Sequence, residues 1–311
     1  MRSYDILVIG EANVDLILSG EDVTPNFGQT EKLVDNARLE LGGSSAIFAC
    51  GASRLGLNVG FAGKLGNDEF GEFLMRVFQE RGIDTAPILI DKEIKTGLTL
   101  HLSQPHDRAM LTYLGTIASM QCNEIDVELF KRTRHIHISS FFLQKGLQEG
   151  LAFIAEKAKE ANTTISIDPG WDPEERWNGL LKSLLDKIDI FLPNAQEAMK
   201  ITSTTSIAEA LIYLNTHLPI PVIKMGRNGA CSLRISEKIE HPGFKVNNVD
   251  TTGAGDSFNA GFLYGYLKDY ELEECLRWGC ACGALSTMSV GGIQSQPTVS
   301  EVELFLSGCN R

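Results

Sequence analysis

The chain has 311 residues, 43% of them hydrophobic and 22% charged, a composition typical of a soluble globular protein with a large buried core. Its 40 acidic and 28 basic residues give a net charge of −12, which argues against nucleic acid or an anionic membrane surface as the main partner. No apolar run reaches the roughly 20 residues of a membrane span, and the first run, 6–9, is too short for a signal peptide. The seven scattered cysteines fit no zinc or redox spacing, so a cytoplasmic location is expected.

The first predicted element is a buried strand at 4–10, followed by a loop that carries Asn13 and Asp15. These side chains are two residues apart, so they point the same way if the segment is extended. They belong either to a simple turn or to a pair of hydroxyl-binding groups at a strand end, where open α/β sheets bind their ligands.

Two glycines, Gly42 and Gly43, precede a helix predicted at 44–55. Their backbone would allow a ligand to approach closely, although a plain turn explains them as well. A strand at 58–64 and a capped helix at 69–81 follow.

Residues 86–115 differ in character from the rest of the chain. Short strands are predicted at 88–90, 96–102 and 110–114, separated by polar turns, which is typical of hairpins without an intervening helix. Together with residues 12–40, this region predicts a small sheet beside the main body. Such a sheet next to a ligand site would act as a lid.

From about residue 134 onward, strands and helices alternate, which predicts a parallel sheet. The strands are expected at 135–139, 163–168, 188–192 and 221–225. The helices between them are expected near 146–160, 174–186, 194–201 and 206–217. Two short strands and three helices complete the chain, at 230–235, 239–242, 254–268, 271–289 and 298–307.

The stretch 250–256 carries the strongest chemical signal. Gly253, Ala254 and Gly255 are small residues at a helix start, where backbone N–H groups lack partners and the helix dipole is positive. Such a cradle suits a phosphate or an oxyanion. Asp256 cannot bind phosphate, but beside the cradle it could accept a proton from an attacking hydroxyl. Taken alone, the stretch fits a helix cap equally well.

Other polar motifs follow strand ends. Asn194 and Glu197 have the spacing of a capping box, but an amide and a carboxylate there could also orient phosphates and hold Mg²⁺ through water. Lys224, Gly226 and Gly229 form a tight turn that could admit a nucleotide. The sequence has neither a Walker-type phosphate loop nor a dinucleotide-binding motif. Asp168 also ends a strand and belongs either to a turn or to a ligand contact.

Over nearly its full length the chain resembles the PfkB/ribokinase family of carbohydrate kinases. The C-terminal signature is matched by residues 250–262, and the N-terminal signature by 42–56 and 63–71. Asn194-x-x-Glu197 and Lys224-Met-Gly226-x-x-Gly229 match the family's Mg/phosphate and nucleotide-turn motifs. The resemblance implies a ribokinase-like α/β fold in a single kinase domain, 1–311, with a central mostly parallel sheet flanked by helices and a small β lid.

The resemblance also implies ATP as phosphoryl donor and Mg²⁺ as cofactor. Asp256 would be the catalytic base, and the N–H groups of Gly253, Ala254 and Gly255 would form the anion hole. The phosphates, Mg²⁺ and the nucleotide would be bound by a second set, Asn194, Glu197, Lys224, Gly226 and Gly229. Asp250 and Thr252 match positions near a monovalent-cation site, which makes K⁺ a candidate ion.

The acceptor pocket would be lined by residues of the N-terminal half and one aromatic residue, namely Asn13, Asp15, Gly42, Gly43 and Phe142. Relatives of the ribokinase type carry an asparagine where this chain has Ile47, and a polar sugar-binding group in the region of Phe141 and Phe142. Both changes predict a more apolar pocket than a pentose needs. Fructose, a keto-deoxy sugar acid, ribose and a nucleoside all stay open as acceptors.

The expected function is therefore ATP-dependent phosphorylation of a hydroxyl, expected to be primary, on a small sugar. A nucleoside kinase is the alternative within the fold, and a non-catalytic sugar- or nucleotide-binding regulator is the alternative outside enzymes. Asp256 argues against the regulator, because binding alone needs no base. Relatives often dimerise through the lid sheet, so a homodimer through residues 96–114 is a further expectation.

Overall fold

The computed structural model describes residues 3–105, 107–177, 179–234 and 237–309. Parts of three predicted elements, at His106, Asn178 and Ile235, lie outside the described residues, as do both ends of the expected 1–311 domain.

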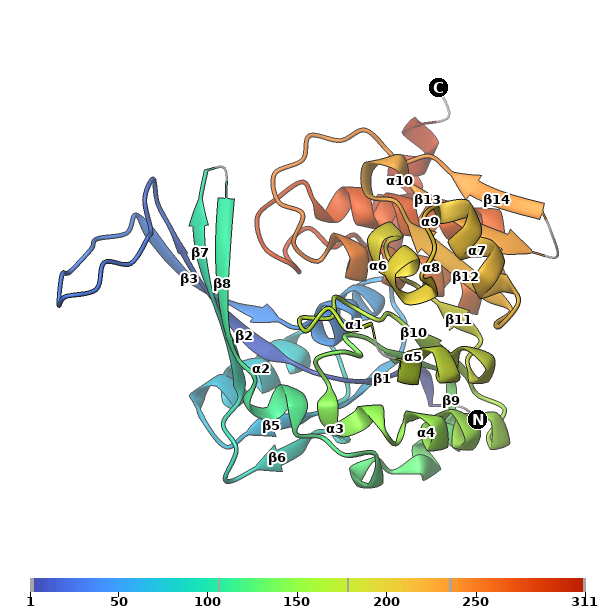
Figure 1. Cartoon of the computed structure of the whole chain (residues 1–311), viewed down its shortest axis with the longest axis horizontal. Coiled ribbons are helices and arrows are strands. Elements are labelled where there is room, and N and C mark those ends of the chain that lie inside the picture. Colours follow the sequence, from blue (N-terminus) through green and yellow to red (C-terminus); the bar gives the residue numbers. More distant parts are fainter. Residues whose placement is uncertain (1–2, 106, 178, 235–236, 310–311) are drawn as a thin grey trace.

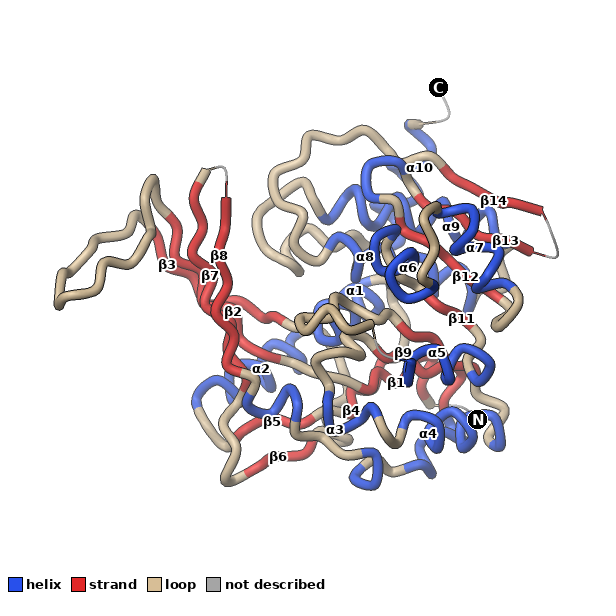
Figure 2. Tube along the Cα trace, in the orientation of Figure 1, coloured by secondary structure: helices blue, strands red, loops and turns tan. Residues whose placement is uncertain are grey.

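A sheet of eight strands forms the body of the molecule, in the order β14-β13-β12-β11-β10-β9-β1-β4 (Figures 1 and 2). The strands from β4 to β12 pair in parallel, and β13 and β14 are antiparallel, so the predicted mostly parallel sheet is confirmed. Their bounds are β1 (Tyr4–Ile9), β4 (Val59–Ala62), β9 (Thr133–Ile138), β10 (Thr164–Ile167), β11 (Ile190–Phe191), β12 (Ile220–Lys224), β13 (Ala230–Arg234) and β14 (Glu237–His241).

Helices cover both faces of this sheet, because its central strands are apolar on both sides. Along β1, Ile6 and Val8 belong to one apolar cluster, and Leu7 and Ile9 to the other. The first cluster includes residues of α1 (Ser44–Arg54), α2 (Glu69–Glu80), α8 (Ala254–Leu267), α9 (Leu272–Ser286) and α10 (Val299–Gly308). The second includes residues of α4 (Leu151–Glu160), α5 (Gly179–Leu184), α6 (Ala195–Thr202) and α7 (Ile207–Asn215).

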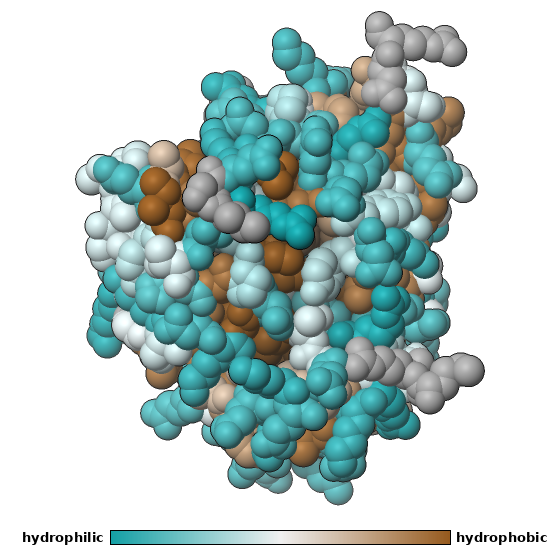
Figure 3. Space-filling view, turned by 90° about the vertical axis from the view of Figure 1, so that its right-hand side faces the viewer, coloured by the Kyte–Doolittle hydropathy of each residue, from teal (hydrophilic) through white to brown (hydrophobic). Residues whose placement is uncertain are grey.

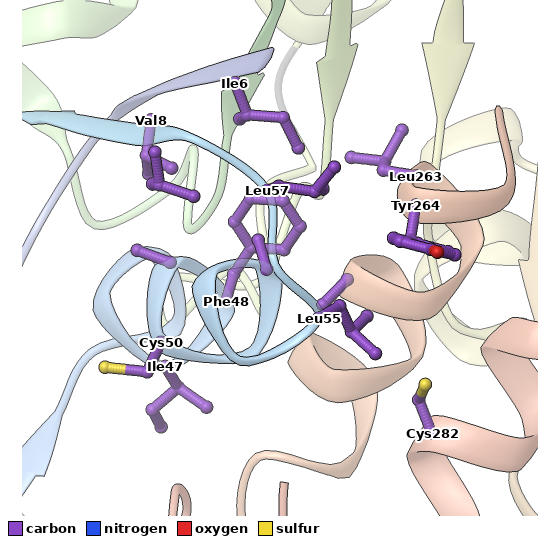
Figure 4. Close-up of a cluster of buried hydrophobic side chains, with 14 of the residues drawn as sticks. Ile6, Val8, Ile47, Phe48, Cys50, Leu55, Leu57, Leu263, Tyr264 and Cys282 are labelled. Carbon is purple, nitrogen blue, oxygen red and sulfur yellow. The ribbon is translucent and has the colours of Figure 1, made fainter. Parts of the chain in front are cut away.

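Figure 4 shows part of the first cluster, where α1 packs against α8 beneath the sheet. Ile47 and Phe48 of α1, Ile6 of β1 and Leu263 of α8 are all buried there. This packing brings the N-termini of the two helices to the same edge of the molecule, which becomes important for the site.

A second sheet of four strands, in the order β3-β2-β7-β8, stands beside the body (left in Figure 1). It consists of β2 (Asn13–Ser19), β3 (Asn36–Gly42), β7 (Gly97–Gln104) and β8 (Asp107–Tyr113). The small sheet expected from residues 12–40 and 86–115 is therefore present. Its make-up differs in one respect, because β6 (Leu89–Asp91) pairs with β5 (Lys64–Gly66) instead of joining it.

The strand predicted at 58–64 divides into β4 and β5 at Gly63. A Cβ at Gly63 would lie 2.7 Å from the Gly10 carbonyl oxygen, so the backbone passes too close for a larger residue. The helix predicted at 146–160 divides in the same way into α3 (Lys145–Gln148) and α4, near Gly150, where a Cβ would lie 2.5 Å from Cys122 Sγ. At both breaks a glycine stands where a larger residue would not fit.

The helix predicted at 174–186 begins only at Gly179. The buried carboxylate of Asp172 accepts hydrogen bonds from three backbone N–H groups, those of Glu174 (3.0 Å), Arg176 (2.9 Å) and Trp177 (2.7 Å). An aspartate side chain that binds the backbone in this way competes with helix formation. Short 3₁₀ helices at 115–118, 122–124 and 127–132 were also not predicted.

In the part of the chain that the structure describes, no helix has the length and apolar character needed to cross a membrane. On the face seen in Figure 3, hydrophilic side chains cover most of the surface and hydrophobic ones show between them.

Candidate active site

The site forms around the first turn of α8. Gly253 precedes this helix with a φ of 72°, a left-handed conformation that favours glycine. A Cβ there would lie 2.8 Å from the Gly292 carbonyl oxygen and 2.9 Å from Ile47 Cγ2. Of the three N–H groups expected in the anion cradle, that of Ala254 already donates to the Thr251 carbonyl, at 3.2 Å. It closes the turn that leads into the helix.

Asp256 lies in this first turn and is partly exposed. Its carboxylate accepts a hydrogen bond from the hydroxyl of Ser44, the first residue of α1, so the N-termini of α1 and α8 meet here. The pKa of Asp256 is raised to about 7, by burial first and by the charge of Asp168 second, against the opposing hydrogen bond from Ser44 and the charge of Lys224. A carboxylate that titrates near neutral pH is well matched to general-base catalysis.

Three polar side chains form a buried cluster beside Asp256: Asp168, after β10; Lys224, at the end of β12; and Asn259, on α8. Lys224 Nζ donates to Asp168 Oδ2 at 2.5 Å and to Asn259 Oδ1 at 3.3 Å, and Asn259 Nδ2 donates to Asp168 Oδ2 at 2.5 Å. Burial acts to lower the pKa of Lys224, but the charges of Asp168 and Glu197 outweigh it and the net shift is upward. Sequence reasoning missed Asn259, although its spacing of three from Asp256 puts both on one helix face.

Asn194 and Glu197 form a complete capping box at the start of α6. Asn194 Oδ1 accepts from the Glu197 N–H at 2.9 Å, and Glu197 Oε2 accepts from the Asn194 N–H at 2.8 Å. Burial raises the pKa of Glu197 to about 7, together with the charge of Asp168. Asn194 and Glu197 therefore do cap the helix. The buried carboxyl group of Glu197 also lies within electrostatic reach of Asp168 and Lys224.

A cavity of about 570 Å³ opens next to the first turn of α8. The predicted residues Lys224, Gly226 and Gly229 line it together with Ala254 and Gly255. Its walls are completed by residues that the sequence did not single out, among them Phe244, Val246, Phe258 and Ala284. The cavity therefore joins an apolar wall to the anion cradle, as a nucleotide with its base and phosphates requires.

On the opposite side of Asp256, four predicted residues lie together at the base of the second sheet. Asn13 Nδ2 donates to Asp15 Oδ1 at 2.9 Å, and Asp15 Oδ1 lies 3.3 Å from His101 Nε2. A Cβ at Gly42 would lie 2.2 Å from the Asp15 carboxylate, and one at Gly43 would lie 3.0 Å from Asn13 Oδ1. The two glycines therefore make room for the two polar side chains.

Phe142 is not brought to this group. Its side chain is 1% exposed and packs edge-on against Phe141 and Trp177, with ring centroids 5.1 and 5.4 Å away, inside the second apolar cluster. The pocket-lining role predicted for this side chain is therefore corrected to a core role. Ile47 is also buried, with methyl groups against the backbone of Gly253 and Gly292.

Asp250 and Thr252 form a closed loop before α8. Asp250 Oδ1 accepts from the Thr252 N–H (2.9 Å) and hydroxyl (2.8 Å), and Oδ2 accepts from the Gly291 N–H (3.0 Å). Arg108 of β8 donates to the Thr252 hydroxyl at 3.4 Å, so the second sheet contacts this loop directly.

A helix N-terminus suited to anions, an adjacent base and a nucleotide-sized cavity on an α/β sheet define a phosphoryl-transferring kinase. The chain belongs to the pfkB family of carbohydrate kinases, whose sequence profile matches residues 3–299. The predictions of this family and of an ATP-dependent carbohydrate kinase are confirmed.

Several known proteins are similar in sequence over most of the chain. An uncharacterized sugar kinase of Archaeoglobus fulgidus is 33% identical over 79% of this chain and 98% of its own. A 5-dehydro-2-deoxygluconokinase of Clostridium botulinum is 30% identical over 98% of this chain and 93% of its own, and fructokinase-1 of Zea mays is 31% identical over 84% and 86%.

Solved structures confirm the predicted ribokinase-like fold. The ribokinase of Arabidopsis thaliana, complexed with ribose and ATP, superposes with a TM-score of 0.86 at 23% identity, covering 98% of this chain and 99% of that one. An E. coli protein described as a candidate ribokinase II, in complex with ATP and Mg²⁺, gives a TM-score of 0.87 at 21% identity with the same coverage.

Proposed function

We propose that this kinase transfers the γ-phosphoryl group of ATP to a primary hydroxyl of a small sugar, with Asp256 as the general base. The observation that carries the proposal is the position and proton affinity of Asp256. It lies in the first turn of α8 and contacts Ser44 at the N-terminus of α1. Its pKa is raised to about 7, by burial first and by the charge of Asp168 second. Near neutral pH it can therefore take a proton from the acceptor hydroxyl and later release it.

The nucleotide is proposed to occupy the 570 Å³ cavity, with its base against the apolar wall and its phosphates toward α8. Support comes from the positive φ angles of Gly226 (56°) and Gly229 (87°), which shape the turn that lines the cavity. The N–H groups of Gly253 and Gly255 then face the transferring group, and the positive end of the α8 dipole favours its charge. The Ala254 N–H contributes less, because it already bonds Thr251.

Mg²⁺ is proposed to bind near Glu197 through water, with Asn194 orienting the phosphates. The residues fit a hydrated cation, because the carboxyl groups of Asp168, Glu197 and Asp256 outnumber the single ammonium group of Lys224 among them. Among the described residues no three His, Cys, Asp or Glu side chains converge as a metal cage, and Mg²⁺ commonly keeps several waters and binds phosphate oxygens. When bound, the ion would neutralise phosphate charge.

K⁺ is proposed to bind near the loop of Asp250 and Thr252. The carboxylate of Asp250 is half-buried and its pKa is lowered by hydrogen bonds from Gly291 and Thr252 in spite of burial, so it is held ionised. Replacing K⁺ by tetramethylammonium in the assay tests this ion separately from Mg²⁺.

The sugar is proposed to bind at the base of the second sheet, where Asn13 and Asp15 present an amide and a carboxylate to its hydroxyls. Two further polar groups lie on the same face of the sheet: Arg38 Nε, which is buried without a hydrogen-bond partner in the described part of the chain, and His101 Nε2, which lies 3.3 Å from Asp15 Oδ1. Buried donors of this kind are normally satisfied, and acceptor oxygens would satisfy them. A ketose or a keto-deoxy sugar acid fits these donors better than a nucleoside does. A nucleoside is the second candidate, because a nucleoside kinase of Methanocaldococcus jannaschii shares the fold with a TM-score of 0.81.

A homodimer is proposed to form through the outer face of the second sheet. Pairing register puts Leu39, Leu100, Leu102, Leu111 and Tyr113 on the face opposite Asp15 and His101. Leu111 is 61% exposed and Tyr113 is 54% exposed, so a second copy would remove substantial apolar area from water. We also propose a cytoplasmic location, which is supported by seven free cysteines, six of them buried.

The test is an ADP-release assay with a panel of ketoses, keto-deoxy sugar acids, pentoses and nucleosides, each with and without K⁺. One acceptor should give a kcat/KM at least about a hundredfold above the others, the discrimination expected when buried polar groups read a substrate. A protein that binds ATP but phosphorylates no member of the panel would instead be a non-catalytic regulator.

A further inference from the structure

Asp168 is a buried carboxylate at the centre of the site, and the proposed mechanism gives it no contact with either reactant. It follows β10 and is 5% exposed. Its partner Lys224 ends β12, and β11 lies between the two strands. The lysine side chain therefore reaches across the carboxyl end of β11 to donate to Asp168, at 2.5 Å. This contact fixes the ammonium group at a specific place on the sheet edge.

Asn259 fixes this pair from the opposite side. It is fully buried on α8, one turn beyond Gly255 and Asp256. Its amide donates to Asp168 and accepts from Lys224, so the three side chains form a closed ring of hydrogen bonds at 2.5, 2.5 and 3.3 Å. Rings of this kind hold their members more rigidly than single bonds, because each bond orients the next.

The ring determines where the ammonium group lies relative to the reacting groups. Lys224 Nζ would be 3.5 Å from a Cβ on Gly255, and Lys224 lines the nucleotide cavity. The charge is thus beside the glycines of the anion cradle. A cation fixed at this point stabilises the charge on a phosphoryl group in transfer without reorganising during the reaction.

Other carboxylates compete for the same ammonium group. Lys224 lies within electrostatic reach of Asp256 as well as Glu197. A direct ion pair with Asp256 would keep the base ionised and lower its proton affinity. Asp168 binds the ammonium group instead.

We propose that Asp168, held by Asn259, is a positioning residue that keeps the Lys224 ammonium group at the anion cradle and away from the Asp256 carboxylate. This inference rests on the proposed function, because it requires a phosphoryl group at the cradle and Asp256 as base. Asp168 itself touches neither reactant in this role and acts through Lys224.

The groups that face Asp256 agree with this role. They are Asp168 after β10, Lys224 on β12, Glu11 after β1 and the Ser44 hydroxyl at the start of α1. Asp168 and Glu11 raise the pKa of Asp256, while Ser44 and Lys224 lower it. Loss of Asp168 would therefore lower the proton affinity of the base in two ways, by removing a negative charge and by releasing Lys224 toward it.

The test is a double-mutant cycle with Asp168→Asn, Lys224→Met and the double variant, measured with ATP and the preferred acceptor. Asp168→Asn should lower kcat by about tenfold or more and change the KM for ATP by less than about threefold. At a pH above the acid limb, the same change in the Lys224→Met background should alter kcat by less than about twofold, because a residue that acts through Lys224 has nothing left to position. The acid limb of the kcat/KM profile should move to lower pH in Asp168→Asn, and by less in the Lys224→Met background, where only the charge of Asp168 is lost.

Asp189→Asn is the matched control, since its carboxylate accepts a backbone N–H of Ile165 (2.7 Å) at the opposite end of β10. It should leave kcat and the pH profile unchanged. Asn259→Ala provides a second route if Asp168→Asn does not fold, and it should show the same non-additivity with Lys224→Met.

Multiplicative losses in the cycle would overturn the proposal, and so would recovery of Asp168→Asn by raised Mg²⁺, which would make Asp168 a metal-binding group. A wild-type protein without kinase activity would instead overturn the proposed function, before any variant is made.

Discussion

Asp256→Asn should give a protein that is both more stable and inactive. Asparagine has the shape of aspartate and its side-chain oxygen can still accept the hydrogen bond of Ser44, but it cannot take a proton from the acceptor. Loss of a general base costs about 10²- to 10⁴-fold, so kcat should fall by that factor. ATP binding should persist, because the cavity walls and the cradle glycines do not change.

The gain in stability follows from the pKa of Asp256. It rises from 3.8 to about 7 on folding, mainly through burial. A shift of about 3 units at 1.36 kcal/mol each means that the ionised carboxylate costs the fold up to about 4 kcal/mol. The folded state holds the proton of Asp256 more tightly than the unfolded state does. The contribution of Asp256 to wild-type stability therefore falls as pH rises from about 4 to about 7 and is then level. The neutral amide avoids this loss, so the advantage of Asp256→Asn should be near zero at pH 4 and largest at pH 8.

Thermal unfolding of the ligand-free protein at pH 4, 6 and 8, calorimetry with ATP and the ADP-release assay measure these quantities. Asp269→Asn, an exposed residue just beyond α8, is the control and should behave as wild type. A kcat within tenfold of wild type would refute Asp256 as the base. A variant that is less stable at pH 8 would refute the electrostatic reasoning, whatever its activity.

Three further predictions concern the hydrogen bond to Asp256, the glycines of the anion cradle and the outer face of the second sheet. Ser44→Ala removes a hydrogen bond that lowers the pKa of Asp256, so the acid limb of the kcat/KM profile should move to higher pH. Gly255→Ala should keep the wild-type Tm, since the added Cβ would meet only Lys224 Nζ, at 3.5 Å. It should still lower kcat/KM for ATP at least about tenfold, because the methyl group narrows the anion cradle formed by residues 253–255. Gly253→Ala should lower kcat/KM and also cost about 1–3 kcal/mol of stability, because of the left-handed backbone there. Leu111→Glu should yield a monomer in light scattering with kcat retained; a dimer with this change would refute the proposed interface.

The sequence predicted the architecture well because the main sheet leaves a strong local signal. Residues 6–9 of β1 are all fully buried, and an uninterrupted apolar run is what a strand of a parallel sheet covered on both faces produces. The helix predicted at 174–186 was wrong in its first part, for an equally local reason. Asp172 binds three backbone N–H groups, and nothing in helical periodicity reveals that a side chain will compete for the backbone.

The site was predictable where one motif holds all its parts, and less so where parts meet across the fold. Ala254 and Gly255 line one cavity together with the turn at Gly226, which their motifs had linked to one ligand. The Asp168–Lys224 pair could not be foreseen, because the two residues are 56 positions apart and meet over the end of an intervening strand. Phe142 failed because a motif fixes a position along the chain and not the direction of its side chain.

Ile47 shows why acceptor recognition has to be sought on the second sheet. The residue is 5% exposed, and its Cγ2 and Cδ1 would each lie 2.9 Å from a Cβ on Gly253 or Gly292. It therefore supports the loop that carries the anion cradle and offers nothing polar to a sugar. An asparagine in this orientation would bury an amide against backbone and methyl groups, at a cost of about 1–3 kcal/mol if unpaired. The acceptor is therefore proposed to meet Asn13, Asp15 and His101, whose sheet also contacts the Asp250–Thr252 loop through Arg108 of β8. On this proposal, one sheet both binds the acceptor and contacts the loop that precedes α8.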